Sequence, residues 1–390
     1  MSEESALILA IQAGNTGQVE ELLLTYPDLS HARHPKGVSA VLWALYNGQP
    51  EIAERLVQER SDLDIFEASA LGRVERLVEL LKEDRQQANT WSADGFQPLG
   101  LACFFRQPSA ARLLVASGAA IDVPSKNGAK VMPLHSAAAS GQVEIARLLL
   151  RLGAPVNAQQ NGGFSALHSA AQNGHLAMLD LLLVYGADLD VRSSEGKSPQ
   201  DLATQGGHGS VAERLQAAAV TRRVILRPYD PVWPIHFRVE VSKLVSLFEP
   251  LLGAIYHIGS TSVPGLLSKP TIDILIEVTD LAGVDQLNER MVELGYEARG
   301  ENGIPERRYF VRADHEIHLV HVHVFRTGNP EVRRHLAFRN FLRRFPKMAD
   351  AYGDLKEELA IRHVLDPDAY TDGKGPFVSE IDRLAAEEEL

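Results

Sequence analysis

The sequence predicts two domains of different fold class: an all-α repeat array over residues 1–219 and a domain of strands and helices over residues 220–390. Three observations support this prediction. One sequence unit recurs after 33 residues in the first half of the chain. The second half contains two short apolar runs separated by a Gly-Ser-Thr-Ser turn. At 390 residues, the chain is also long enough for two ordinary domains.

The repeat is clearest in its two central copies. One reads Pro-Leu-His-Ser-Ala-Ala from residue 133 and the other reads Ala-Leu-His-Ser-Ala-Ala from residue 166, so His135 and His168 lie 33 residues apart. Each copy predicts a short helix, a glycine break, a longer leucine-rich helix and a Gly-Ala turn. The unit resembles the ankyrin repeat, which has this period. Degenerate copies extend the array to about seven units over residues 1–219.

An array of this kind buries its leucine stripe by stacking and leaves a concave face of loops and first helices. The resemblance implies that this concave face binds a protein partner; a rigid spacer or a lid over the neighbouring domain are the alternatives. At their position in the motif, His135 and His168 are expected to bond to backbone rather than to a metal ion. Phe104 and Phe105 could anchor a partner, or they could belong to the core.

The composition narrows the class of protein. The net charge of −12 argues against a protein that coats nucleic acid. Cys103 is the sole cysteine, so no disulfide can form within the chain. The acidic start at residues 1–5 does not look like a signal peptide, and no apolar run is long enough to span a bilayer. We therefore expect a soluble cytoplasmic protein without a membrane partner.

Apolar alternation and helical spacing predict the elements of the second half. They are a strand that ends in a proline-rich turn at 222–233, a helix at 235–251, strands at 255–258, 271–278 and 317–324, and a helix at 331–344.

Five motifs of the second half occur together and in order. They are Tyr-Asp-Pro at 229–231, His-Ile-Gly-Ser-Thr-Ser-Val-Pro-Gly at 257–265, Lys-Pro-Thr-Ile-Asp-Ile at 269–274, His-Val-His at 321–323 and Phe-Arg-Asn-Phe-Leu-Arg at 338–343. From about residue 222 to the C-terminus, this pattern resembles the GrpB family. GrpB proteins are similar in turn to the nucleotidyltransferase superfamily. The resemblance implies an α/β fold in which a mixed sheet is flanked by helices.

The superfamily resemblance implies a phosphate site beside a metal site. Gly259 would let backbone amides approach a phosphate closely, and the hydroxyls of Ser260, Thr261 and Ser262 would add donors. Asp273 would hold a divalent metal ion, Mg²⁺ or Mn²⁺, that bridges the oxygens of a nucleoside triphosphate.

The sequence departs from the superfamily pattern at the second acid. Leu275 stands where the pattern has a carboxylate, and Glu277 lies further along the same strand face. His321 and His323 share a face of a later strand. Together with Asp273 they could bind a transition metal, since imidazole suits such ions. They could instead contact phosphate, act as acid and base, or be two hydrogen-bonded histidines on a half-exposed strand.

Basic residues in the second half are further candidates for phosphate binding. Arg339 and Arg343 are four residues apart and share a helix face, which suits a phosphate better than a lone lysine would. Arg308, Lys269 and Lys374 are the other candidates. The alternative is a solvated basic face.

Two functions follow from these expectations. The first is an enzyme that transfers a nucleotidyl or phosphoryl group, with Asp273, His321 and His323 at the reaction centre and the array recruiting a protein acceptor. The second is a non-catalytic nucleotide-sensing or protein-interaction scaffold that has lost two-metal chemistry, because Leu275 replaces the second acid. A structural adaptor without a small ligand is a third alternative.

Overall fold

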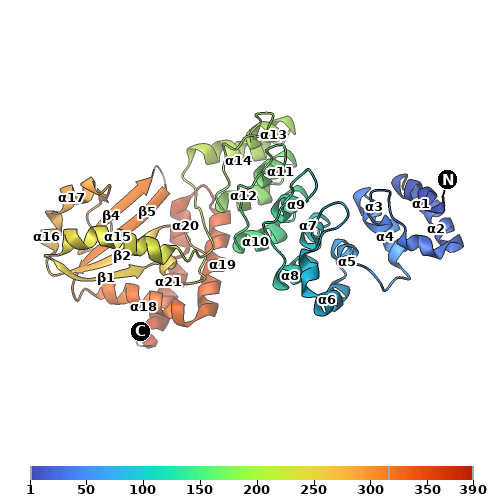
Figure 1. Cartoon of the computed structure of the whole chain (residues 1–390). Coiled ribbons are helices and arrows are strands. Elements are labelled where there is room, and N and C mark those ends of the chain that lie inside the picture. The colour runs from blue at the N-terminus through green and yellow to red at the C-terminus, as the bar shows by residue number, and fades with distance from the viewer. Residues whose placement is uncertain (1, 315–316, 389–390) are drawn as a thin grey trace. The chain divides into compact units, whose positions relative to one another are not determined.

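The computed structural model describes residues 2–314 and 317–388. The chain divides into two compact units (Figure 1). The first unit comprises residues 1–182 and 187–216, and the second comprises residues 183–186 and 217–390. Within the described residues, no helix combines the length and the hydrophobicity that a bilayer crossing needs.

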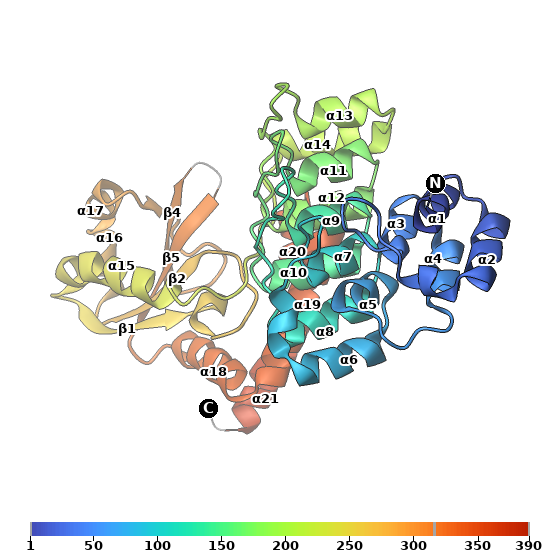
Figure 2. The same cartoon turned by 45° about the vertical axis from the view of Figure 1, so that its right-hand side comes forward.

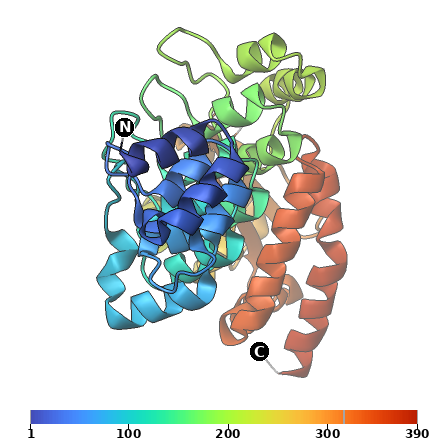
Figure 3. The ribbon, with the colours of Figure 1, turned by 90° about the vertical axis from the view of Figure 1, so that its right-hand side faces the viewer.

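The first half of the chain is helical, and its α-helices follow one another as seven short pairs (Figures 1 and 3). The α-helices are α1 (Glu3–Gln12), α2 (Thr16–Thr25), α3 (Ala40–Tyr46), α4 (Pro50–Val57), α5 (Ile65–Leu71), α6 (Val74–Glu83), α7 (Pro98–Phe104), α8 (Pro108–Ala116), α9 (Pro133–Ala139), α10 (Val143–Arg151), α11 (Ala166–Gln172), α12 (Leu176–Val184), α13 (Pro199–Gln205) and α14 (Gly209–Val220). Two 3₁₀ helices, η1 (Pro27–His31) and η2 (Arg85–Asn89), occur among them. The all-α fold class predicted for this half is confirmed.

The two motif histidines have the structural role that the sequence predicts. Nδ1 of His135 accepts a hydrogen bond from the amide of Met132 at 3.1 Å, and Nε2 lies 2.9 Å from the carbonyl oxygen of Ala158. His168 repeats the arrangement, with Nε2 3.1 Å from the carbonyl oxygen of Lys197. Burial lowers the pKa of both rings, so both are neutral and link successive units.

The aromatic pair at the end of α7 divides between core and surface. Phe105 packs against a buried apolar cluster, with its ring centre 5.2 Å from that of Tyr46. Phe104 remains 44% exposed. Phe105 therefore belongs to the core, and Phe104 alone keeps the exposure that a partner anchor requires.

The second unit contains the mixed sheet that the sequence predicts. Its strand order is β1-β2-β5-β4-β3, with β2 and β5 parallel and the other neighbours antiparallel. The strands are β1 (Leu252–Ile258), β2 (Ile272–Val278), β3 (Glu297–Ala298), β4 (Arg307–Asp314) and β5 (Ile317–Arg326).

The α-helices of this unit are α15 (Trp233–Phe248), α16 (Leu281–Asp285), α17 (Asn288–Glu293), α18 (Pro330–Arg344), α19 (Pro346–Arg362), α20 (Pro367–Gly373) and α21 (Gly375–Glu387). Helices α15 to α17 cover one face of the sheet and α18 covers the other, whereas α19 and α21 pack on α18 (Figures 1 and 2). The short 3₁₀ helix η3 (Ser260–Ser262) follows β1.

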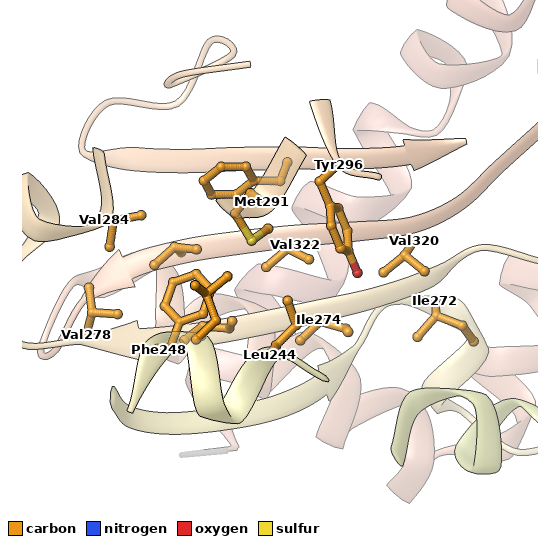
Figure 4. Packing of buried hydrophobic residues seen from close by; sticks show 14 of the residues in the cluster. Leu244, Phe248, Ile272, Ile274, Val278, Val284, Met291, Tyr296, Val320 and Val322 are labelled. Atoms are coloured by element: carbon orange, nitrogen blue, oxygen red, sulfur yellow. The ribbon is translucent and has the colours of Figure 1, made fainter. Parts of the chain in front are cut away.

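The main core lies between α15 and one sheet face. Leu244 and Phe248 point from the helix toward the strand residues Ile274 and Val322 (Figure 4). All four side chains are fully buried. Burial of an aromatic side chain of this size contributes up to about 3 kcal/mol, so this contact fixes α15 on the sheet.

The opposite face carries a smaller apolar cluster. Ile258, Leu275 and Phe325 of the sheet pack there against Val332 of α18. Since successive residues of a strand face opposite sides, Asp273 shares this second face with Leu275. The polar group described below therefore lies on the face opposite α15.

Two predicted elements of the second half differ from the structure: one strand is not formed, and one helix has other bounds. The strand predicted to begin at residue 222 is wrong, because this segment forms only an isolated bridge between Arg227 and Ser268. Pro228 has no amide hydrogen and cannot continue the pairing. The helix predicted at 235–251 begins at Trp233 and ends at Phe248.

Candidate metal and phosphate site

The register of the sheet places one carboxylate and two imidazoles on the same face. Asp273 of β2 pairs with His321 of β5, and His323 follows two residues later. Oδ1 of Asp273 lies 3.0 Å from Nδ1 of His321 and 3.9 Å from Nε2 of His323. One potential ligand atom from each residue lies within 4.8 Å of the other two, and residues 2–314 and 317–388 contain no second group of this kind. The structure thus brings the three predicted metal ligands together.

The protonation states of this group suit a metal ion. Burial by itself would raise the pKa of Asp273, but the interactions with His321 and His323 outweigh it and hold that pKa well below its usual range. Burial lowers the pKa of His323, and the charge of Asp273 only partly opposes this effect. At neutral pH the carboxylate is ionised and His323 is neutral, which are the forms that bind a metal.

A fourth residue, His318, reaches the group through a β-bulge. The pairing of β4 with β5 shifts between Arg312 and Ala313, which leaves Leu319 as an extra residue on β5. Strict alternation would point His318 away from His321. The bulge instead turns His318 to the same face, with its Nδ1 2.9 Å from Nε2 of His321. His318 was not predicted from the sequence, because the alternation of a regular strand places it on the opposite face.

His321 is therefore held through both ring nitrogens. Its Nδ1 faces Asp273, and its Nε2 faces His318. A partner on the second ring nitrogen is typical of metal-binding histidines, because it fixes the orientation of the ring. The ring of Tyr309 lies beside the imidazoles of His321 and His323, at 5.4 and 5.0 Å between ring centres.

Leu275 occupies the position at which the superfamily pattern has a second acid. Its side chain is fully buried and packs with Ile258 and Phe325. Glu277 lies four residues after Asp273, about 13 Å away at the usual rise of a strand. Of the two carboxylates in β2, only Asp273 is therefore close to His321 and His323.

The Gly-Ser-Thr-Ser segment forms a tight turn against Asp273. Gly259 has a φ of 69°, and a Cβ at this position would overlap Oδ2 of Asp273. The hydroxyls of Thr261 and Ser262 donate to backbone carbonyls, at 3.0 and 2.6 Å. Among the described contacts, only the hydroxyl of Ser260 makes no bond to the backbone. Thr261 and Ser262 thus stabilise the turn, and Ser260 is the hydroxyl left for a ligand.

Two of the three arginines that were predicted to bind phosphate contact the protein backbone instead. Arg339 donates to the carbonyl oxygen of His257 at 3.0 Å, and Arg343 donates to that of Ser262 at 2.7 Å. These bonds join α18 to the end of β1 and to the turn. The shared helix face was predicted correctly, but its partner is the turn itself.

Arg308 lies away from the predicted site. It pairs in register with Val324, whose side chain belongs to the core on the α15 face of the sheet. There its guanidinium forms an ion pair with Asp285 of α16, with Nη2 2.9 Å from Oδ2. The structure therefore does not support the prediction that Arg308 binds the same phosphate as Ser260.

Lys269 and Lys374, which were predicted to bind phosphate, lie near a third lysine that the sequence did not reveal. Their ammonium groups lie 5.6 and 4.6 Å from the centre of the Tyr370 ring. Nζ of Lys356, on α19, lies 3.2 Å from Oγ of Ser260, and this residue is only 2% exposed. Burial lowers the pKa of all three lysines, to about 8 for Lys374. We call Lys269, Lys356 and Lys374 the lysine cluster.

The burial of His257 predicts that the stability of the second unit depends on pH. Its buried ring stacks on Phe237 with 4.6 Å between the ring centres, and its Nε2 lies 3.2 Å from Oγ1 of Thr261. Burial is the main cause that lowers the pKa of His257 to about 4. An unfolded histidine has a pKa of about 6.5, so between pH 6.5 and 4 only the unfolded state binds the proton. Stability must therefore fall as the pH falls through this range.

Lowering the pH from 7 to 5 is expected to remove about 2 kcal/mol of stability through His257. Urea unfolding can be followed with Trp43 and Trp91 replaced by phenylalanine, so that fluorescence reports the buried Trp233 alone. Between pH 7 and 5, the free energy of unfolding of His257→Gln should therefore fall by about 2 kcal/mol less than that of the parent. His236→Gln, at an exposed position of α15, is the control and should match the parent. Equal losses in His257→Gln and the parent would contradict the prediction.

Comparisons with known proteins identify the second half of the chain. The sequence model of the GrpB protein family matches residues 223–383. The glutamate-rich protein GrpB of Alkalihalophilus pseudofirmus is 31% identical over 162 residues, which cover 93% of that protein and 40% of this chain. The chain belongs to the GrpB family. Its GrpB domain contains the turn, the lysine cluster and the three candidate metal ligands Asp273, His321 and His323, which we call the metal-ligand group.

Further GrpB relatives show how much of each protein is shared. UPF0157 protein YqkA of Bacillus subtilis is 40% identical over 164 residues, 42% of this chain. The match covers 48% of YqkA, so the chain spans about half the length of that relative. The crystal structure of the conserved protein GrpB from Enterococcus faecalis matches at 38% identity with a TM-score of 0.41. That match covers 42% of this chain and 99% of the other.

The first half of the chain also matches a known family. The model for ankyrin repeats in many copies matches residues 134–183, which cover most of the two central repeat copies. The predicted resemblance to ankyrin repeats is thereby confirmed. Ankyrin repeats suggest that this half of the GrpB-family chain takes part in protein–protein interaction.

Proposed function

We propose that the GrpB domain binds a nucleotide or another phosphate-bearing ligand together with a divalent metal ion. The observation that carries this proposal is the metal-ligand group, in which Asp273, His321 and His323 offer three ligand atoms within 4.8 Å of one another. The lysine cluster supplies positive charge for the phosphates, and one of its members contacts Ser260 of the turn.

The ligand set indicates the kind of metal. One carboxylate and two imidazoles suit Mn²⁺ or another transition metal better than Mg²⁺, which prefers oxygen ligands. Held there, such an ion would neutralise charge on phosphate oxygens. His318 would orient His321 through its second ring nitrogen.

The corresponding activity would be transfer of a nucleotidyl or phosphoryl group. Positioning and charge neutralisation account for most of the catalysis of such reactions. The concave face of the ankyrin repeats would bind the protein partner or acceptor. Asp273, His321 and His323 would then act at the reaction centre.

A non-catalytic nucleotide sensor is the second candidate, and one observation favours it. Leu275 fills the position of the second acid with a fully buried apolar side chain, so the two-carboxylate arrangement of two-metal chemistry is missing there. Such a protein would bind the ligand and report it to a partner of the ankyrin repeats.

Thermal unfolding of the full chain tests the proposed function. Each of the four ribonucleoside triphosphates is added alone, with Mg²⁺ and with Mn²⁺. A ligand at 100 times its Kd stabilises the folded state by about 2.7 kcal/mol, which corresponds to several degrees in Tm. We expect a nucleotide-dependent shift that requires the metal and is larger with Mn²⁺. No shift with any nucleotide under any of these conditions would refute the proposal.

A release assay separates the two candidates once binding is established. An enzyme should release pyrophosphate or phosphate, or label an acceptor protein, when nucleotide and metal are both present. A sensor should show the thermal shift without turnover.

A further inference from the structure

We propose that Lys269, Lys356 and Lys374 form a polyphosphate subsite, so that the ligand carries two or more linked phosphates rather than one. This inference rests on the proposed function, because it specifies which phosphate ligand the domain takes.

The three lysines come from separate segments and meet in space. Lys269 precedes β2, Lys356 lies in the middle of α19, and Lys374 lies between α20 and α21. The ring of Tyr370 contacts the ammonium groups of Lys269 and Lys374. Nζ of Lys356 lies 3.2 Å from Oγ of Ser260, next to Gly259, which packs against Asp273. The charges of Lys269 and Lys374 both lower the pKa of Lys356, as expected for ammonium groups that share one region. The charge of Asp273 acts on all three as well, so the cluster adjoins the metal-ligand group.

These ammonium groups lack a counter-ion of their own. Within residues 2–314 and 317–388, no carboxylate lies within ion-pairing distance of any of them. Asp273 is already engaged by His321 and His323. Lys356 makes one hydrogen bond, to Ser260, although its side chain is almost completely buried. Burial without a counter-ion destabilises the charged form of these lysines, so the cluster is arranged for an anion that comes from outside the chain.

The amount of charge favours a polyphosphate. With a divalent metal at Asp273, the ion, the carboxylate and three protonated lysines would together carry about four positive charges. A phosphate monoester supplies only about two negative charges. A chain of linked phosphates supplies more charge and can place one group at the metal while the others contact the lysines.

Inorganic tripolyphosphate, pyrophosphate and orthophosphate are suitable probes because they lack a nucleoside. Their binding to the full chain is measured by calorimetry in the presence of EDTA, so that the metal plays no part. We expect the affinity to fall from tripolyphosphate to pyrophosphate to orthophosphate, by at least about tenfold overall. Orthophosphate that binds as tightly as tripolyphosphate would overturn the inference.

Variants of the lysine cluster separate ligand binding from folding. Lys356→Met replaces a buried amine that has no ionic partner by an apolar side chain of similar length, so it should raise the Tm of the free chain while it weakens tripolyphosphate binding at least about tenfold. A lysine with only a structural role would lower the Tm instead. Lys374→Gln is a second variant at a half-buried position and should weaken binding to a similar extent. Lys347→Gln, at an exposed position of α19, is the matched control and should bind as the parent does. Unchanged binding in both Lys356→Met and Lys374→Gln would overturn the proposal.

ATP and GTP identify the source of the phosphates. Tighter binding of a nucleoside triphosphate than of tripolyphosphate would indicate a nucleotide ligand, and equal affinities would indicate inorganic polyphosphate; both results support the subsite. Phosphate binding by the lysine cluster and metal-dependent binding of nucleotides are tested separately, so either can fail without the other. Metal-dependent nucleotide binding that is unaffected in the lysine variants would refute the subsite alone. Lysine-dependent tripolyphosphate binding without any metal dependence of nucleotide binding would refute the proposed metal role alone.

Discussion

Replacing Asp273 by asparagine is expected to weaken Mn²⁺ binding by the full chain more than about 100-fold, since even residues that only orient metal ligands change affinity by 10- to 100-fold. Asparagine has the shape of aspartate and can keep the contact with His321, whose Nδ1 lies 3.0 Å from Oδ1. It has no charge to balance a divalent cation. The two remaining ligands, His321 and His323, are neutral imidazoles, and two such groups hold a metal ion weakly.

Calorimetric titration of Mn²⁺ at pH 7.5 measures this effect. Asp285→Asn is the matched control, because Asp285 is the same residue type, pairs with Arg308 and lies on the opposite face of the sheet. The control should bind Mn²⁺ as the parent does. Equal metal affinity in the two variants would remove Asp273 from the proposed site, even if nucleotides still bind.

The grouping of Asp273, His321 and His323 could be predicted from the sequence because the relevant strands are regular there. Alternation places His321 and His323 on one face, and it places Asp273 on a definite face of its own strand. The register of the parallel pair, which alternation does not specify, then aligns Asp273 with His321. Alternation does not predict the β-bulge at Leu319. The position of His318, which depends on this bulge, could therefore not be predicted.

The basic residues show a different limit. A spacing of four predicted that Arg339 and Arg343 share a helix face, but spacing does not reveal what that face packs against. In the folded domain, the two arginines on this face donate hydrogen bonds to backbone carbonyl groups. Lys356 lies beside Glu357 in the sequence and resembles a solvent-exposed helix position. Its contact with Ser260, 96 residues away in the chain, depends on tertiary packing that no local pattern encodes.

The fold of the first half was predictable because it depends on contacts between residues that are close in the sequence. Each ankyrin unit contacts chiefly its sequence neighbours, so a pattern that repeats every 33 residues contains most of the structural information. The role of His135 and His168 followed from their place in this pattern, and their bonds to backbone confirm it. A repeat does not encode its partner in the same way. The exposed Phe104 is therefore the residue at which a search for that partner should begin.

Gly259→Ala is expected to disable the site although it leaves every proposed metal and phosphate ligand in place. Gly259 has φ of 69° and ψ of −174°, a combination that is almost confined to glycine and costs other residues about 1–3 kcal/mol. The added methyl group would also overlap the carboxylate of Asp273. The turn or the carboxylate must then move. We expect Mn²⁺ affinity to fall at least about tenfold, as it does when the support of a metal ligand is disturbed.

Gly265→Ala in the same loop separates backbone strain from this overlap. Gly265 also has a positive φ, of 80°, but a Cβ there would have no atom within 4 Å. Both variants should lose stability in urea unfolding because of their backbone conformation, and only Gly259→Ala should also lose metal affinity. If the two variants bind Mn²⁺ equally well, close packing of the turn against Asp273 is not required for the site. If Gly259→Ala alone loses the metal, the glycine of the Gly-Ser turn is needed to make room for the carboxylate, a role distinct from that of contacting phosphate.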